Sequence, residues 1–327
     1  MKQNTNSIFT PPISNLFTRN TDPDLLSQML QNAHGKIPYN MTNDYMFRTV
    51  LQANNKVLRG LICSLLHLEE SEVHSVTVTN PIVLGTAIHD KEIRLDINVM
   101  LNDRNIINLE MQVTHHLNWQ NRSLLYLSRS FDNLNRGRDY LDVHPAMHIG
   151  FLDYTLFPDH PEFYATYKLT NMKNHHVYSD NFVLSVVNLS CINLATEEDK
   201  QYHIDAWARL FKATTWEEVR QMAATNEYLQ EASKSIFQFN TEEQIRKMCL
   251  DREEYYLDQR RDKQTIAQQE TEIAALHTTI DSLQATIDGQ QITIDKQQTT
   301  IDKQQAIIAD LQANIDKLFT LVQQPVR

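Results

Sequence analysis

The sequence predicts an α/β protein in which a mixed sheet is flanked by helices and is followed by a helical segment and a long C-terminal coiled coil. Two adjoining runs, residues 93–101 and 106–113, alternate apolar and polar residues with the two-residue period of a strand. Helical patterns precede and follow these runs, which favours a sheet covered by helices. From residue 266 onward, β-branched residues recur at every seventh position, as in a coiled coil.

Changes in composition divide the chain of 327 residues into five predicted segments. Residues 1–36 are rich in Asn, Thr, Ser and Pro and are expected to form a flexible leader. Residues 37–195 carry the α/β core, and residues 196–264 have the apolar spacing of a helical accessory segment. The coiled coil is expected over residues 265–322, which leaves 323–327 as a tail.

The elements before the two strands are predicted from capping and breaker residues. Asp44 can cap a helix that runs through Leu51, and the helical pattern resumes from Leu58 to Leu68. The stretch 69–84 contains a run of Val and Ile residues with Asn80-Pro81 as punctuation, which predicts the first strand.

The two alternating runs are expected to form a hairpin, because the polar cluster 102–105 between them is typical of a turn. Matching their apolar faces requires a register in which paired residue numbers have an even sum. A sum of 206 puts Asp96 directly opposite Glu110. Gln112 shares the face of Glu110, because side chains two positions apart point the same way.

Two carboxylates directly opposite each other destabilise a sheet, so their pairing needs a physical reason. A shared divalent cation is one reason, since carboxylate oxygens bind such ions. A one-residue bulge or a solvated face, on which the carboxylates only keep the hairpin soluble, remains the alternative at this point.

The elements after the hairpin follow the same reasoning. A helix is predicted from about residue 118 to 135, capped by Gly137, and its Arg122, Tyr126, Arg129 and Arg136 recur on one face. That face could meet phosphates, or it could pair with the protein's own carboxylates. Strands are predicted at 146–153 and 182–187, and from about residue 197 the spacing of Trp, Leu, Phe and Val is helical.

The coiled coil is predicted by the residues at its a and d positions. Its β-branched a residues with Leu at d favour two parallel strands, although three consecutive Gln layers weaken the middle. The a positions are Ile266, Ile273, Ile280, Ile287, Ile294, Ile301, Ile308, Ile315 and Val322, and the d positions are Gln269, Leu276, Leu283, Gln290, Gln297, Gln304, Leu311 and Leu318. A parallel homodimer through residues 265–322, about 85 Å long, is the leading expectation.

Composition excludes several classes of protein. The three cysteines are isolated, so neither a zinc ribbon nor a disulfide framework is indicated, and a reducing cytoplasm fits. The sequence shows no signal peptide and no apolar run long enough to span a bilayer, so no membrane partner is expected. The net charge of −11 is unfavourable for binding nucleic acid unless basic residues cluster locally.

Histidines give weaker signals. His115-His116 follows the second strand closely enough to approach a metal there. His144 and His148 have the spacing of a helical metal pair, but they straddle Pro145 at the start of a predicted strand, where this spacing does not converge.

As an ordered set, these motifs resemble the recombination-promoting nuclease (Rpn) and putative transposase family of the PD-(D/E)XK nuclease superfamily. The resemblance runs from about residue 40 to 262. The residues that carry it are Asn43 to Arg48, Arg94 to Ile97, Leu109 to Gln112, Arg122 to Tyr126, Gly137 with Tyr140, and Met147 to Leu152. The chain departs from the pattern at Leu95, where Pro is usual, at Gln112, where Lys is commonest in the superfamily, and at Arg48, where Lys is expected.

The resemblance implies a PD-(D/E)XK restriction-endonuclease-like core and a Mg²⁺-dependent DNA endonuclease linked to recombination or mobile DNA, with Mn²⁺ as an alternative ion. Asp96 and Glu110 would hold the metal, and Gln112 would orient the attacking water, because a neutral amide can only act through hydrogen bonds. Arg122 and Tyr126 would contact phosphate, and Asp44 would add an accessory contact at the metal. Two alternatives stay open: a catalytically silent interaction protein on a relic nuclease core, and a metal-dependent RNase.

Overall fold

The computed structural model describes residues 23–82, 96–113, 118–133 and 139–322, and these divide into two compact units, Met1–Tyr256 and Leu257–Arg327. The helices are α1 (Pro23–Asn32), α2 (Asp44–Ala53), α3 (Asn55–Leu66), α4 (Trp119–Phe131), α5 (Glu197–Gln201), α6 (Ile204–Lys212), α7 (Trp216–Ala223), α8 (Glu227–Thr241) and α9 (Glu243–Val322). The strands are β1 (Val76–Val78), β2 (Ile97–Leu101), β3 (Asn105–Gln112), β4 (Ala146–Leu152), β5 (Tyr164–Lys168) and β6 (Phe182–Asn188). Short 3₁₀ helices are η2 (Glu70–Glu72), η3 (Tyr140–Asp142) and η4 (Leu189–Leu194).

The described strands form one mixed sheet in the order β1-β2-β3-β4-β6-β5. The pairs β1–β2, β2–β3 and β5–β6 are antiparallel, whereas β3–β4 and β4–β6 are parallel. Parallel neighbours need a crossover connection, and α4 lies in the connection between β3 and β4. The predicted fold class, a mixed sheet flanked by helices, is confirmed for this unit.

The predicted hairpin is present as β2 and β3, and its register is the predicted one. Ile97 pairs with Leu109 and Val99 pairs with Ile107, so paired numbers sum to 206. Asn102 and Asp103 in the turn have φ values of 51° and 54°. Two consecutive residues with positive φ are characteristic of a type I′ turn, whose twist matches that of the strands.

One face of the sheet carries the main hydrophobic core. Phe47 of α2, Phe151 of β4 and Phe211 of α6 pack against one another with ring centroids 5.4–5.7 Å apart. The odd-numbered residues of β3, from Ile107 to Met111, belong to the same core, as do buried residues of α3, α7 and α8. The helices that follow β6 therefore share one core with the sheet.

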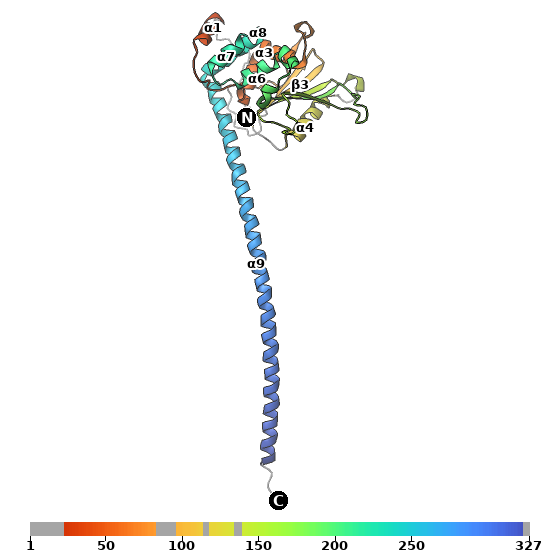
Figure 1. Cartoon of the computed structure of the whole chain (residues 1–327), viewed down its shortest axis with the longest axis vertical. Helices are drawn as coiled ribbons and strands as arrows, with labels where there is room; N and C mark the ends of the chain where they lie inside the picture. Colours follow the sequence, from red (N-terminus) through yellow and green to blue (C-terminus); the bar gives the residue numbers. More distant parts are fainter. Residues whose placement is uncertain (1–22, 83–95, 114–117, 134–138, 323–327) are drawn as a thin grey trace, which may run out of the picture. The chain divides into compact units, whose positions relative to one another are not determined.

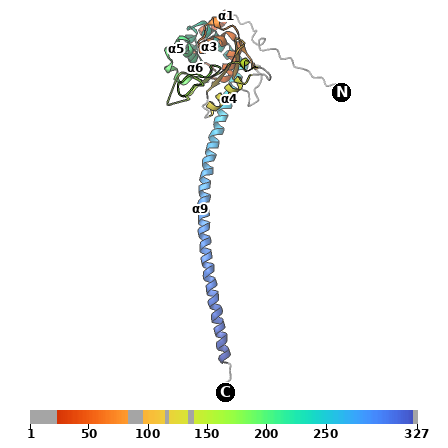
Figure 2. The ribbon, with the colours of Figure 1, turned by 90° about the vertical axis from the view of Figure 1, so that its right-hand side faces the viewer.

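The opposite face of the sheet is covered by α4. Trp119 of α4 packs with Leu152 and Val186 in a second, smaller apolar cluster. Gly150 makes this contact possible, because a Cβ at that position would clash with the Trp119 ring. Figures 1 and 2 both show α4 apart from α3 and α6, on the other side of the sheet.

The structure corrects two expectations about the first part of the chain. Residues 23–32, expected to lie in a loose leader, form α1, and Leu30 is buried in the main core. The N-cap of α2 is Asn43, whose side chain accepts hydrogen bonds from the amides of Tyr45 and Met46. Asp44, predicted as the cap, is instead the first residue of the helix.

The strand expected within 69–84 is present as β1 but spans three residues, and its last predicted residues, 83 and 84, lie outside the described residues. The strands predicted at 146–153 and 182–187 are confirmed as β4 and β6. β5 was not predicted, because the alternating residues of this edge strand include Ala165 and Lys168 and all are half-buried or exposed.

Helix α9 contributes to both units. In its first turns, Ile245, Met248 and Cys249 are buried in the main core. In the second unit, the isoleucines at the predicted a positions are largely exposed, with Ile266 and Ile273 each 53% accessible. A single long helix is therefore present where the coiled coil was predicted. Among the described residues, no helix is both long and apolar enough to cross a membrane.

Candidate active site

The two predicted carboxylates lie across the β2–β3 pair from each other. Asp96 immediately precedes β2, and the register of the hairpin, continued by one residue, sets it opposite Glu110. Glu110 lies within β3, where only 12% of its side chain is accessible. The backbone thus brings together the carboxylates that alternation and register predicted.

The face that carries these side chains is buried rather than solvated. Asn108, Glu110 and Gln112 are 2%, 9% and 5% exposed, because α4 lies over them. The alternative of a solvated face that only keeps the hairpin soluble is therefore wrong. The regular pairing along β2 and β3 also leaves no place for the one-residue bulge.

Arg122 of α4 links Glu110 to Gln112. Its Nη2 donates a hydrogen bond to Glu110 Oε1 at 2.5 Å and a second hydrogen bond to Gln112 Oε1. Side chains two residues apart on β3 are thus tied together by one guanidinium. Of the two interpretations of the α4 face, the structure shows for Arg122 the pairing with the protein's own carboxylate.

Asn108 and His148 complete the buried polar group and were not assigned to it from the sequence. Asn108 Nδ2 donates to Asp96 Oδ2 at 2.8 Å, and His148 Nδ1 lies 2.6 Å from Asn108 Oδ1. His148 Nε2 lies 3.6 Å from Glu110 Oε2. One feature of the sequence bears on this arrangement: His148 is an even-numbered residue of β4, as Asn108 and Glu110 are of β3. Even-numbered residues of the two strands pair with each other in the parallel register that the structure shows, and the sequence does not reveal that register.

Burial sets the protonation state of His148. The side chain is fully buried, and this burial, together with the nearby charge of Arg122, lowers the pKa of His148 to about 3. The imidazole is therefore neutral at ordinary pH.

Arg48 and Asn80 hold the backbone at Asp96. The Arg48 guanidinium donates hydrogen bonds to the carbonyl oxygens of Asp96 and Asn80, and Asn80 Nδ2 donates to the same Asp96 oxygen at 3.0 Å. Arg48 is fully buried, and burial lowers its pKa to about 10. These contacts fix the residue that leads into β2.

The accessory residues predicted from the sequence lie in different places. Tyr126 faces His148, with ring centroids 6.1 Å apart, so it belongs to the surroundings of the site. The carboxylate of Asp44 instead accepts hydrogen bonds from Arg252 Nη2 and the Tyr256 hydroxyl, each at 2.6 Å. These contacts tie α2 to α9. Arg136, Gly137, His115 and His116 lie outside the described residues.

The donor atoms of the site suit a divalent ion, although no group of three or more His, Cys, Asp or Glu residues within the described ranges is arranged to hold one. Two carboxylates share one face, and the Nε2 atom of His148 is buried without a hydrogen-bond partner in the described part of the chain. Carboxylate oxygens and a neutral ring nitrogen are common ligands of divalent metals. The residues present thus fit such an ion.

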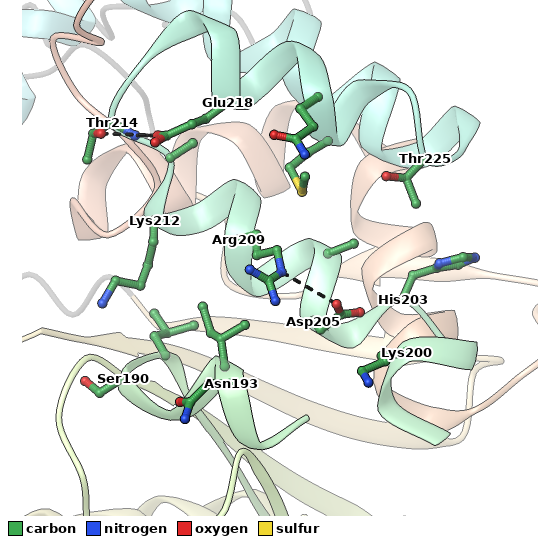
Figure 3. Close-up of a pocket in the computed structure, with 16 residues that line it drawn as sticks. Ser190, Asn193, Lys200, His203, Asp205, Arg209, Lys212, Thr214, Glu218 and Thr225 are labelled. Atoms are coloured by element: carbon green, nitrogen blue, oxygen red, sulfur yellow. Dashed lines mark hydrogen bonds and ion pairs between the residues drawn. The ribbon is translucent and has the colours of Figure 1, made fainter. Parts of the chain in front are cut away.

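A cavity of about 840 Å³ lies elsewhere, between η4 and the helices α6 and α7 (Figure 3). Its lining includes Lys200, Arg209 and Lys212, but each of these cations is paired with a carboxylate at 2.7–3.6 Å. Asp96, Glu110 and Gln112 do not line it. We therefore do not assign the predicted chemistry to this cavity.

Comparison with known proteins identifies the family of the chain. The family model of PD-(D/E)XK nuclease family transposases matches residues 41–265, more than half of the chain, and this range includes Asp96, Glu110 and Gln112. No match was found among curated proteins or among solved structures. The resemblance seen in the sequence is thereby confirmed, and the chain belongs to the family of PD-(D/E)XK nuclease family transposases.

Proposed function

We propose that the protein is a metal-dependent DNA endonuclease. The observation that carries this proposal is the group formed by half-buried Asp96 with buried Glu110 and Gln112, in which the hairpin register sets two carboxylates opposite each other on one face. A relic nuclease core would have no need to keep two like charges in this position, because like charges directly opposite each other destabilise a sheet.

In the proposed mechanism, Asp96 and Glu110 hold the ion, with Mg²⁺ as the leading choice and Mn²⁺ as the alternative. A bound divalent ion supplies Lewis acidity, which activates water and stabilises charge on the phosphate. Gln112 orients the attacking water through its side-chain amide. Arg48 and Asn80 keep the Asp96 backbone in place, so the carboxylate does not have to be ordered when substrate binds.

Arg122 and Tyr126 are proposed to contact the phosphate. Arg122 uses Nη2 for Glu110 and Gln112, and a guanidinium has five N–H donors, so further donors remain for an oxygen of the substrate. Arg129 lies further along α4 and is exposed, where it can neutralise another phosphate of the same strand. This local cluster would offset the acidity of the whole chain.

We further propose that residues 265–322 form a parallel coiled-coil homodimer. The heptad isoleucines of α9 are exposed along a helix that a second copy could bury. In a parallel pair, each Gln at d meets the same Gln of the partner, whereas antiparallel pairing would set it against Ile.

The family name also supports a role in recombination or mobile DNA.

Cleavage of supercoiled plasmid and of RNA by the purified chain tests the proposal, with Mg²⁺, Mn²⁺ or chelator present. We expect ion-dependent nicking of DNA. Asp96→Ala should abolish it while the protein stays folded, because losing one of two opposed carboxylates weakens the ion site and relieves repulsion. Asp159→Ala is the matched control, since the Asp159 side chain is 76% exposed.

The other outcomes separate the rival functions. Cleavage of RNA alone would assign a ribonuclease. No cleavage of either polymer with any ion would favour the interaction protein on a relic core. Wild-type cleavage by folded Asp96→Ala would show that the chemistry lies elsewhere.

A further inference from the structure

His148 lies beside Glu110 on the buried face of the sheet. β3 and β4 pair in parallel, with Asn108 opposite His148 and Glu110 opposite Gly150. Glu110 is thereby flanked on one side by the strand that Asp96 leads into and on the other side by the strand of His148. The imidazole is fully buried, beneath α4 and close to Trp119 and Tyr126.

The hydrogen bonds of Asn108 decide which ring nitrogen of His148 carries the proton. Asn108 Nδ2 donates to Asp96 Oδ2 at 2.8 Å and to Asn98 Oδ1 at 2.6 Å, so its Oδ1 must be the atom that faces His148. An amide oxygen only accepts, and therefore His148 Nδ1 is the donor at 2.6 Å. This network assigns the tautomer and leaves a lone pair on Nε2.

The nitrogen that carries this lone pair lies near a carboxylate oxygen. Nε2 is buried without a hydrogen-bond partner in the described part of the chain and lies 3.6 Å from Glu110 Oε2. Two acceptors cannot bond each other, and an unsatisfied buried acceptor usually costs about 1–3 kcal/mol. A second proton on the ring would remove the conflict, but it would add a positive charge next to the Arg122 guanidinium, which already donates to Glu110.

A metal ion removes the conflict without a proton. Two ligands that bind one ion at about 2.1 Å lie roughly 3.0–3.5 Å apart when the angle between them is about 90–110°. The observed separation of 3.6 Å is close to this range. The hydrogen bond from Nδ1 to Asn108 is also the kind of contact that orients a metal-binding imidazole and fixes its tautomer.

We propose that His148 Nε2 is a ligand of the divalent ion, together with the carboxylate of Glu110. The inference rests on the proposed metal-dependent function and extends it to ion selectivity. Imidazole nitrogen suits later first-row ions, whereas Mg²⁺ prefers oxygen ligands throughout. The site should therefore bind Co²⁺ more tightly than a site made of carboxylates alone, with a smaller gain for Mn²⁺.

The competing interpretation is structural: His148 Nε2 would only accept a hydrogen bond from Arg122 after a small movement. Arg122 Nε is itself buried without a hydrogen-bond partner in the described part of the chain. In that case, replacing His148 would alter stability but not the affinity for ions. The two interpretations thus differ in a quantity that can be measured without catalysis.

The experiment is titration of the full-length protein with Co²⁺, Mn²⁺ and Mg²⁺ by calorimetry, with thermal unfolding as the check of folding. His148→Asn keeps a side-chain N–H near the Nδ1 position and removes Nε2. We expect its affinity for Co²⁺ to fall about tenfold or more, with smaller changes for Mn²⁺ and Mg²⁺. His160→Asn, at a histidine whose side chain is 83% exposed, should match wild type.

A spectroscopic measurement covers the case in which His148→Asn does not fold. Electron spin-echo spectra of Mn²⁺ bound to wild type should show coupling to an imidazole nitrogen. The coupling should persist in His115→Asn and His116→Asn, which removes those histidines as its source. Absence of the nitrogen coupling in wild type, or its loss in either of these variants, would overturn the inference.

Failure of this inference can be told apart from failure of the proposed function. Folded His148→Asn that binds all three ions with wild-type affinity, while wild type cleaves DNA, would remove His148 from the metal site and leave the nuclease intact. Wild type that binds none of the ions and cleaves nothing would refute both.

Discussion

Gln112 shows how one residue of the site depends on its neighbour. Its side-chain oxygen accepts a hydrogen bond from Arg122, and the residue is 5% exposed. A Lys, the commoner residue of the superfamily, would place a second cation against this guanidinium. The amide at this position and the arginine on α4 are therefore complementary.

We predict that Gln112→Leu loses most cleavage activity, because it removes the group proposed to orient water. Gln112→Lys alone should lower the free energy of unfolding by about 1–3 kcal/mol, because Arg122 loses its hydrogen bond to residue 112 and the two cations repel each other. Adding Arg122→Gln should recover part of this loss. Chemical denaturation of Gln112→Lys, of Arg122→Gln and of the double variant measures the coupling between the two positions. Fully additive effects would show that residues 112 and 122 act independently.

Arg48 acts on Asp96 through the backbone. A buried cation that donates to neutral carbonyl oxygens is costly to desolvate, and the lowered pKa of Arg48 reflects that burial. Its retention at such a cost is explained if the position of Asp96 is important.

We predict that Arg48→Met lowers stability by about 1–3 kcal/mol, because the carbonyl oxygens of Asp96 and Asn80 each lose a donor and only Asn80 Nδ2 still holds the Asp96 oxygen. Below the unfolding temperature, the variant should also bind Mn²⁺ more weakly, since Asp96 is no longer fixed. Arg261→Met is the control, at a side chain that is 75% exposed. A folded Arg48→Met with unchanged ion affinity would reduce Arg48 to a purely structural residue.

Secondary-structure elements differ in how far the sequence predicts them. The β2–β3 hairpin follows from local alternation, and its register follows from matching two apolar faces, so Asp96, Glu110 and Gln112 could be grouped in advance. The place of His148 could not, because it depends on the parallel pairing of β3 with β4 across a long connection. β5 was missed because an exposed edge strand need not alternate in hydrophobicity.

Helix α9 is attached to the core by contacts that the sequence did not reveal. Arg252 and Tyr256 lie in a charged stretch of the sequence, yet both hydrogen-bond to Asp44, which is 6% exposed. The spacing of Arg252 and Tyr256 is that of one helix face. Asp44 therefore connects α2, the helix that carries Arg48, to the start of α9.

We predict that Arg252→Met lowers the free energy of unfolding by about 3–5 kcal/mol, because it leaves the buried Asp44 carboxylate without its cation. The double variant Asp44→Asn with Arg252→Met should be less destabilised than Arg252→Met alone, since no unpaired charge remains. Urea denaturation gives the free energy of unfolding of Arg252→Met, of Asp44→Asn and of the double variant. A double variant as unstable as the sum of the singles would contradict the buried ion pair.

At the scale of the whole molecule, the chain separates a packed unit, which holds the site, from a helix with exposed isoleucines. In the proposed coiled coil a partner would bury these isoleucines, and most helices gain their stability from such packing. The charge on the e and g positions is low, as they are mainly Thr and Gln, so the apolar a layers and the Gln layers at d would set the register.

We predict that deletion of residues 265–327 leaves a folded core that no longer self-associates. The core keeps Arg252 and Tyr256 on their Asp44 partner, so the first unit retains the contacts that hold the start of α9. Cleavage at one site needs one chain, and the truncated protein should still nick DNA. Paired cutting of both strands and binding to long DNA should weaken, because two linked sites gain from a high effective concentration.

Sedimentation of the full-length and truncated proteins measures the oligomeric state. A full-length protein that stays monomeric at micromolar concentration would refute the homodimer and would mean that the heptad face takes a different partner.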